Sequence, residues 1–414
     1  MSLEKKRNMP LAEKLALIDK IANDINEKNG KKIVGRIGAD PDILDKLSIK
    51  FIPSNSSDFN RATGGGYPRS RCVVISGPED SGKTSRVLED IGYNMSIDPE
   101  FVACWIESEK SLEKNFVCET FHIDPDRFVF IEYEPERGAE GILDMLYGFM
   151  TAVKFDIVCI NSLKCLVPKK ILEDDFDQAT PAVAARLNSL MVQKFTALVA
   201  DSEASFILIT HTYTSIGGYG SPQVISGGRA IRYWAALTML FSKTKIDEKK
   251  DPIGKDEGVH IGVKVNKNHC TPDRNPYVQF DYFAMFGKGT EQYLSKMNAF
   301  CDAGIMENNK GNIKIFDTNG DEIWSTRGKN NYREYMINNP EFFKSLVERL
   351  ENGGSTVKSM SDKEIDEAKK LEEEDKVASE ELQSQVDVQG AQGTKPVKVA
   401  KKNTKKESKT KNKE

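Results

Sequence analysis

Short, continuous hydrophobic runs recur between residues 60 and 287, and stretches with a helical pattern separate them. A strand that is buried on both faces appears as an unbroken apolar run, so this pattern predicts a largely parallel sheet with helices on both faces. The last runs predict a hairpin-like extension of that sheet. The fold class is therefore α/β. The predicted strands are VVIS, VACWIE, FVFIEY, DIVCINS, FILITH, ALTMLF, HIGVKV and YVQFDYF.

The segment before this sheet has a helical pattern over residues 10–28, which predicts an amphipathic helix. The following KKIVGRIG, residues 31–38, predicts a short strand. The segment is too short to build a core, so its apolar stripe is expected to pack on the body of the same chain or on a neighbouring subunit. Its apolar positions recur at spacings of three and four: Leu11, Leu15, Ile18, Ile21 and Ile25.

The region after the sheet predicts a small α/β unit, with two helical patterns around NIKIFD and EIWST. Beyond it the pattern fails, and residues 395–413 carry nine lysines against one glutamate. Low apolar content and blocks of charge predict a disordered tail. The expected organisation is an N-terminal arm (1–45), a core (46–289), a C-terminal unit (290–353) and a charged tail (354–414).

Composition changes this picture little. The net charge of -4 is a small difference between 59 basic and 63 acidic residues, so no whole-chain field indicates a nucleic acid or a membrane. The seven cysteines form no C-x-x-C pair, which is typical of reduced thiols in a cytosolic protein. No run is long enough to span a bilayer, and the first residues lack a signal-peptide core. We therefore expect a soluble, intracellular protein.

The chemistry begins with GPEDSGKT, residues 77–84, which fits the phosphate-loop pattern G-x-x-x-x-G-K-[ST] directly after a strand-like run. Backbone N–H groups of this phosphate loop are expected to hold phosphates, with Lys83 on the β and γ oxygens and Thr84 on Mg²⁺. The motif therefore predicts a site for a nucleotide, ATP, with Mg²⁺. The predicted nucleotide-binding residues are Gly77, Pro78, Glu79, Asp80, Ser81, Gly82, Lys83, Thr84 and Ser85.

Three predicted strands end in polar side chains. Glu107 and Glu109 follow one strand, where a carboxylate can polarise the water that attacks a γ-phosphate, although a solvated strand end is the alternative. Asn161 stands where P-loop enzymes ordinarily carry an Asp that orients the Mg²⁺ water shell. Its neutral amide predicts a weakened metal site, unless a neighbouring glutamate supplies the missing charge. Thr210 and His211 end a third strand and are expected to sense a terminal phosphate, with a purely structural histidine as the alternative.

A long stretch rich in Gly, Ser and Thr, THTYTSIGGYGSPQVISGG, follows this third strand. So long a loop inside a compact domain is usually functional. Ile216, Gly217 and Tyr219 are expected to meet a flexible partner there.

Taken together, these segments resemble the RecA-type homologous-recombination ATPases over most of the chain. The helix and strand of the arm resemble the family's subunit-joining segment, and Glu109 falls on its catalytic glutamate. The segments that carry the resemblance are SNSSDFNRATGGGYPRSRCVVISGPEDSGKT, WIESEKSLEKNF, INSLKCLVPK, PAVAARLNSL, THTYTSIGGYGSPQVISGGRAIRYWA, KVNKNHCTP and NNPEFFKSLVERL.

The resemblance implies a RecA-like P-loop NTPase core with a polymerisation arm and a small C-terminal α/β domain. It implies a DNA-dependent ATPase that forms filaments on single-stranded DNA and exchanges strands with a homologous duplex in recombination and repair. Base pairing would supply recognition, because the protein contacts phosphates and wedges side chains between bases. Self-association, single-strand-binding and loader proteins are the other implied partners, in the cytoplasm at the nucleoid and without a membrane.

The resemblance also assigns individual residues. Lys83, Glu109 and His211 take catalytic positions, and His211 fills the sensor position. Phe116 falls where an aromatic ring stacks near the adenine, and Lys267 and His269 fall where cations reach the neighbouring subunit's ATP. The implied DNA-binding residues are Pro181, Arg186, Ile216, Gly217, Tyr219, Gly227, Gly228 and Arg229.

Three departures from the family pattern stand out: Asn161 in place of Asp, His269 in place of a second cation, and a tail that ends basic. They suggest a divergent member, for which a phage origin is one interpretation. Two alternative functions remain at this stage. One is a RecA-fold hexameric helicase, which would not account for the arm and the C-terminal unit. The other is a nucleotide-gated scaffold that coats DNA with little hydrolysis, which Asn161 favours.

Overall fold

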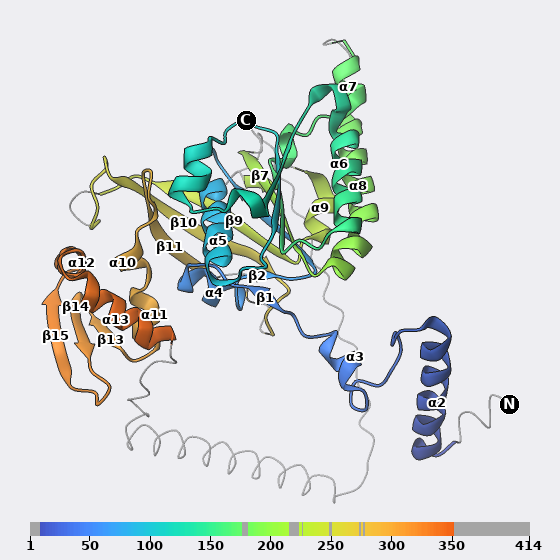
Figure 1. Cartoon of the computed structure of the whole chain (residues 1–414), viewed down its shortest axis with the longest axis horizontal. Helices are drawn as coiled ribbons and strands as arrows, with labels where there is room; N and C mark the ends of the chain where they lie inside the picture. Colours follow the sequence, from blue (N-terminus) through green and yellow to red (C-terminus); the bar gives the residue numbers. More distant parts are fainter. Residues whose placement is uncertain are drawn as a thin grey trace, which may run out of the picture. The chain divides into compact units, whose positions relative to one another are not determined.

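The computed structural model describes residues 9–351, apart from residues 176–180, 215–222, 226, 248–250, 273–274 and 276–277 (Figure 1). A large mixed sheet forms the centre of this part of the chain, with strand order β12-β11-β10-β9-β3-β7-β6-β4-β5, and β8 paired to β7. The strands are β3 (Arg71–Gly77), β4 (Ala103–Glu107), β5 (Phe128–Glu132), β6 (Ile157–Asn161), β7 (Ser205–Thr214), β8 (Gln223–Ile225), β9 (Leu237–Thr244), β10 (Gly258–Asn268), β11 (Gln279–Met285) and β12 (Gly289–Thr290).

The sheet has a parallel part and an antiparallel extension. Strands β9, β3, β7, β6, β4 and β5 pair in parallel. Strands β10, β11 and β12 then continue antiparallel from β9. Both the α/β fold class and the hairpin-like extension predicted from the hydrophobic runs are confirmed.

Hydrophobic clusters cover both faces of the parallel part. Alternate residues of β3 point to opposite faces, so Val73 and Ile75 join one cluster whereas Cys72 and Val74 join the other. Helices α4 (Ser57–Thr63) and α5 (Lys83–Ile97) pack on the first face. Helices α6 (Gly138–Ala152), α8 (Pro181–Ser202) and α9 (Gly228–Trp234) pack on the second, where α6 and α8 run side by side (Figure 1). A short helix, α7 (Lys169–Glu173), follows β6.

Strand register gathers the polar strand ends at one edge of the sheet. His211 of β7 lies opposite Gly77 of β3, and Asn161 of β6 lies opposite Glu107 of β4. Because the carboxyl ends of parallel strands meet at one edge, residues far apart in the sequence face the same space. This edge holds the candidate site.

The arm is partly as predicted. Helix α2 (Leu11–Asn29) is confirmed, and α3 (Pro41–Asp45) follows it. The predicted strand over residues 31–38 is wrong for this chain, because the segment has no strand partner within the described residues. Instead, the Asn26 side chain accepts the N–H groups of Ile33 and Val34 at 2.8 and 3.1 Å. The segment is thus held against α2 by a side chain rather than by a sheet.

Most of the apolar stripe of α2 is exposed to solvent in the single chain, whereas Leu15 and Ile25 are half-buried. Leu11 is 70% exposed and Ile21 48% exposed, and Ile33 and Ile37 beyond the helix are also exposed. The arm therefore presents apolar surface that the described part of its own chain leaves uncovered.

Short β1 (Phe51–Ile52) and β2 (Tyr67–Pro68) pair with each other at the start of the core.

The C-terminal unit has its own hydrophobic cluster, built around Phe300, Ile313, Ile315, Tyr332 and Met336. The α/β character expected here is present, although strand β13 was not predicted. Residues 352–414, the end of this unit and the whole tail, lie outside the described residues. The elements are α10 (Gln292–Ser295), α11 (Met297–Asp302), β13 (Met306–Asn309), β14 (Asn312–Phe316), β15 (Glu322–Arg327), α12 (Lys329–Asn338) and α13 (Pro340–Glu351).

All seven cysteines are free thiols. Burial raises the pKa of the Cys104 thiol to about 12, so this group is not a thiolate at neutral pH. In the part of the chain that the structure describes, no helix is both long and apolar enough to cross a membrane.

Candidate nucleotide and DNA site

The phosphate loop joins the end of β3 to the start of α5. Gly82 caps the helix with φ 76°, and Asp80 also has a positive φ of 55°. A Cβ atom on Gly77 would lie 2.4 Å from the carbonyl oxygen of Phe241, so the loop passes too close to β9 for a side chain there. Glycine meets these demands at positions 77 and 82, whereas Asp80 is of a residue type that tolerates a positive φ. The loop leaves backbone N–H groups at the helix N-terminus.

Lys83 is the buried cation of this loop. Its Nζ donates to the Pro78 carbonyl oxygen at 2.6 Å and lies 3.4 Å from the Ser81 hydroxyl. Burial lowers the pKa of the Lys83 ammonium, whereas the nearby charges of Glu109 and Asp80 oppose that shift. The ammonium is thus held where it can meet phosphate oxygens.

Asn161 and Glu107 form a buried acid–amide pair. The Asn161 Nδ2 donates to Glu107 Oε2 at 2.8 Å, and the Trp105 indole donates to the same oxygen at 3.0 Å. The other oxygen of Glu107 accepts the backbone N–H of Glu109 at 3.0 Å. Glu107 is 2% exposed. Its carboxylate therefore orients Asn161 and the turn that carries Glu109, and it is not available to activate water.

Glu109 and His211 meet across the sheet edge. The His211 Nε2 lies 2.8 Å from Glu109 Oε1, and each side chain is about one quarter exposed. Burial raises the pKa of the Glu109 carboxyl, but the Ser162 hydroxyl, the His211 imidazole and the Lys83 charge lower it more. The net pKa lies below the ordinary value. Glu109 is therefore an ionised, reachable carboxylate beside the phosphate loop, which is what a general base requires.

A cavity of about 240 Å³ lies at this edge of the sheet. Its wall includes the phosphate loop from Glu79 to Ser85 together with Glu109, Phe116, Asn161 and His211. The sequence analysis predicted all of these residues, and the structure brings them together.

A second cavity of about 320 Å³ adjoins the first, because both are lined by Asp80, Gly82, Ser85 and Phe116. Most of its other lining residues come from β11, the turn after it and β12, and the rest are Phe121, Val259 and the charged Arg86, Glu89 and Lys243. The two cavities form a polar end and an apolar end, as a phosphate chain and a base require. Sequence reasoning missed this apolar wall: Tyr282, Met285, Phe286 and Gly287.

Thr84 and Asn161 were predicted to serve a metal, and the structure places their oxygens together. The Thr84 hydroxyl donates to Asn161 Oδ1 at 3.2 Å. No group of three or more His, Cys, Asp or Glu side chains suited to a metal occurs among the described residues. Mg²⁺ is typically bound by one or two protein ligands plus substrate phosphates, so this neutral oxygen pair beside the phosphate loop fits Mg²⁺ that arrives with a nucleotide.

Lys267 and His269 lie elsewhere. The Lys267 Nζ donates to the carbonyl oxygens of Arg232 and Tyr233 at 3.0 and 3.2 Å. Burial lowers the pKa of this ammonium. Among the described residues that line the two cavities, neither Lys267 nor His269 occurs. Both residues therefore lie outside the described lining of the two cavities of their own chain.

The structure describes five of the eight predicted DNA-binding residues. Arg186 on α8 and Arg229 on α9 are both exposed. Gly227 and Gly228 have φ values of 109° and 83° at the start of α9, a helix that packs beside α8 (Figure 1). Pro181 is the first residue of α8. Ile216, Gly217 and Tyr219 lie outside the described residues.

Asn188 is a residue that sequence reasoning missed at this surface. Its Nδ2 on α8 donates to the Gly227 carbonyl oxygen at 3.1 Å and so ties α8 to the start of α9. No local sequence signal marks it, because its partner is distant in the chain.

A parallel sheet whose phosphate loop opens onto a helix, with an ionised carboxylate across from Lys83, defines a nucleotide-binding protein of the P-loop class. Comparison with known proteins identifies the family within this class. The family model described as the RecA N-terminal domain matches residues 16–291, more than half of the chain. The chain therefore belongs to the RecA family.

Several curated proteins named Protein RecA align with this chain over most of their own length. Protein RecA of Nostoc punctiforme is 28% identical over 381 residues, which cover 89% of this chain and 99% of the relative. Protein RecA of Heliobacterium modesticaldum is 28% identical over 330 residues, covering 79% and 89%. Protein RecA of Trichodesmium erythraeum is 26% identical over 376 residues, covering 89% and 98%. The predicted resemblance to RecA-type recombinases is confirmed.

Proposed function

We propose that this chain is an ATP-dependent DNA recombinase that assembles on single-stranded DNA and pairs it with a homologous duplex. The observation that carries the proposal is the cavity where the phosphate loop, Glu109 and His211 converge, in a chain of the RecA family. Neither the helicase nor the non-hydrolysing scaffold is favoured, since the family model and the similar curated proteins are all named for RecA.

Each residue of the cavity has a role in hydrolysis. The loop N–H groups and Lys83 bind the β and γ phosphates, and Glu109 accepts a proton from the attacking water. Thr84, with Asn161 beside it, would hold Mg²⁺, which would neutralise phosphate charge. Phe116 and the apolar wall hold the base. His211 donates to the terminal phosphate or to Glu109, so its partner changes when that phosphate leaves.

Strand β7 offers a route from the nucleotide to DNA. His211 lies within β7, which continues to Thr214 and pairs there with β8. The chain then reaches Gly227 and α9, where Gly227 is tied to Asn188. A change of partner at His211 is thereby passed along a strand to the exposed Arg186 and Arg229, which contact phosphates of the single strand.

A second copy of the chain completes the assembly. The exposed stripe of α2 and the segment at residues 31–38 dock on a neighbouring subunit, and Lys267 and His269 reach that neighbour's nucleotide. Single-strand-binding and loader proteins are further partners, and the setting is the cytoplasm at the nucleoid. Single-stranded DNA should stimulate ATP hydrolysis by the full chain. A rate of ATP hydrolysis that is the same with and without single-stranded DNA would refute the proposal.

Deleting residues 10–36 is expected to give a folded monomer that binds single-stranded DNA weakly. The reason is that this segment carries apolar surface which its own chain leaves exposed. Analytical ultracentrifugation and DNA-binding titrations check both parts. Unchanged filaments in electron micrographs of the deletion variant would refute the assignment of the arm.

Replacing Arg229 by Ala is expected to weaken binding to every single-stranded sequence alike, and to reduce the slope of log affinity against log salt by about 0.7. Each lost phosphate contact releases one counterion fewer. Lys154→Ala is the matched control, because Lys154 is exposed but lies before the start of β6, at the opposite edge of the sheet. Equal salt slopes for the parent and Arg229→Ala would exclude Arg229 from the DNA surface.

A further inference from the structure

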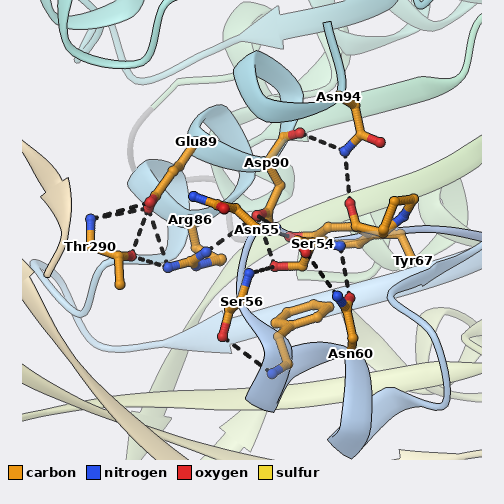
Figure 2. A network of polar contacts seen from close by, with 12 residues as sticks. Ser54, Asn55, Ser56, Asn60, Tyr67, Arg86, Glu89, Asp90, Asn94 and Thr290 are labelled. Atoms are coloured by element: carbon orange, nitrogen blue, oxygen red, sulfur yellow. Dashed lines mark hydrogen bonds and ion pairs between the residues drawn. The ribbon is translucent and has the colours of Figure 1, made fainter. Parts of the chain in front are cut away.

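A buried ionic network centres on α5 (Figure 2), and some of its residues line the apolar cavity. Arg86 is 1% exposed, and its Nη1 lies 3.2 Å from Asp90 Oδ1. Its Nη2 lies 3.2 Å from Glu89 Oε2. Asp90, itself fully buried, also accepts the hydroxyls of Ser54 and Tyr67 at 2.8 and 2.7 Å. The network thus holds α5 to the segments that precede the phosphate loop.

The network extends to the segment that leads into the C-terminal unit. The Thr290 hydroxyl donates to Glu89 Oε2 at 2.7 Å, and the Thr290 N–H donates to both oxygens of that carboxylate at 3.3 and 3.2 Å. Arg86 Nη2 in turn donates to the Thr290 hydroxyl. Thr290 ends β12, so Arg86 and Glu89 together fix this strand against α5 (Figure 2).

The next residue carries the connection further. Glu291 is 4% exposed, accepts the Leu294 N–H at 2.6 Å and so caps α10. Its other oxygen accepts Arg333 Nε of α12 at 3.1 Å. A continuous path of hydrogen bonds and one peptide link therefore runs from Arg86 on the phosphate-loop helix to α12 of the C-terminal unit.

At its other end the path reaches the phosphate loop. The Arg86 guanidinium lies over the Tyr282 ring, 4.7 Å from the ring centroid. The Tyr282 hydroxyl oxygen lies 3.3 Å from the point that a Cβ atom on Gly82 would occupy. Arg86, Glu89, Tyr282 and Thr290 all line the apolar cavity of about 320 Å³. Whatever fills that cavity contacts the network directly.

Stability alone does not account for such a network. A buried ion pair loses so much hydration that apolar residues of similar volume often stabilise a fold equally well or better. Arg86 Nε moreover lacks a hydrogen-bond partner in the part of the chain that the structure describes. Arg86 also borders a small cavity on the side of the C-terminal unit, lined by Gln292, Ser295 and Lys296. The arrangement favours a role in setting geometry between the nucleotide cavity and α10.

We propose that Arg86 is a positioning residue that couples occupation of the apolar cavity to the C-terminal unit. A nucleotide base in the cavity contacts Tyr282 and Arg86 and so restricts the position of the Arg86 side chain. The contacts from Arg86 through Glu89 to Thr290 pass this restriction to the next residue, Glu291. Glu291 caps α10 and binds Arg333 of α12, so both helices respond. The coupling rests on the proposed function, because it takes the cavity as the base end of the nucleotide site.

The test is hydrogen exchange in the full chain, with and without ADP and a slowly hydrolysed ATP analogue in the presence of Mg²⁺. In the parent, nucleotide is expected to slow exchange over residues 292–338 about fivefold or more, the lower end of typical allosteric couplings. Thr290→Val keeps the shape of Thr290 but removes its hydroxyl bonds. Because Thr290 also lines the cavity, nucleotide is added at a saturating concentration for each variant, and Thr290→Val is then expected to lose the change in exchange.

Asp302→Asn is the matched control. It weakens another contact between the core and the C-terminal unit, the 2.9 Å pair with Arg61, which lies outside the cavity. The control should keep the nucleotide response. Arg86→Lys, which cannot hold Asp90, Glu89 and Thr290 at once, should respond only partly. If Thr290→Val fails to fold, Glu89→Gln serves in the same test.

Three outcomes would overturn the coupling: a full response in Thr290→Val, the loss of the response in Asp302→Asn, or nucleotide binding to the parent without any response. The last of these leaves the proposed function intact. A parent that binds no nucleotide at all would overturn the proposed function together with the coupling.

Discussion

Glu109→Gln is expected to lower DNA-dependent ATP hydrolysis by about 10²–10⁴-fold, the usual contribution of a general base. The substitution keeps the size of the side chain and removes only the charge that accepts a proton from water. ATP binding and assembly on single-stranded DNA should remain, because Lys83 and the loop N–H groups are untouched. Steady-state hydrolysis and nucleotide-binding titrations measure the two effects separately.

Glu113→Gln is the matched control, because Glu113 is an exposed carboxylate close in the sequence and is absent from the described lining of the 240 Å³ cavity. It should hydrolyse ATP like the parent. Equal rates for Glu109→Gln and the parent would show that the catalytic assignment is wrong. A loss of both ATP binding and ATP hydrolysis would instead show that Glu109 has a structural role in the nucleotide site.

Asn161→Asp is expected to slow turnover and to lower the free energy of unfolding by about 1–3 kcal/mol. The amide of Asn161 donates to the buried Glu107 carboxylate at 2.8 Å. An aspartate would replace this donor by a second negative charge at the same distance, and buried like charges repel. If the metal site is weakened, as the neutral amide of Asn161 predicts, this variant would instead bind Mg²⁺ more tightly. The pairing with Glu107 favours the alternative, in which a neighbouring carboxylate already supplies the charge.

The double variant Asn161→Asp with Glu107→Gln decides between these interpretations. It exchanges the acid and the amide, so that one negative charge and one hydrogen bond remain. Chemical denaturation and Mg²⁺ titrations of hydrolysis should show recovery of stability and of most of the turnover. A stable single variant that needs less Mg²⁺ than the parent would restore the interpretation of a weakened metal site.

The central sheet could be predicted because its strands are buried on both faces and appear as unbroken apolar runs. Strands β8 and β13 could not, since they are short and lack such runs. The strand predicted at residues 31–38 has a strand's composition, but a strand also needs a partner. In the described part of the chain, Asn26 Oδ1 accepts the backbone N–H groups of Ile33 and Val34 that a neighbouring strand would otherwise bind.

The candidate site could be predicted in part because strand ends of a parallel sheet meet at one edge. Its finer chemistry depends on register. Glu107 and Asn161 are 54 residues apart and meet only because β4 and β6 pair. The sequence therefore could not reveal that Glu107 orients Asn161. Arg86 likewise looks like an exposed helix residue until its partners Glu89, Asp90 and Thr290 are placed around it.

Strand exchange between a circular single strand and a homologous linear duplex tests the central claim most directly. With ATP and Mg²⁺ present, the full chain should convert these DNAs to a nicked circle and a displaced strand. The reaction should need homology and should fail in Lys83→Ala, which lacks the phosphate-loop cation. DNA-stimulated ATP hydrolysis without any exchange, or exchange that proceeds equally well without nucleotide, would contradict the account.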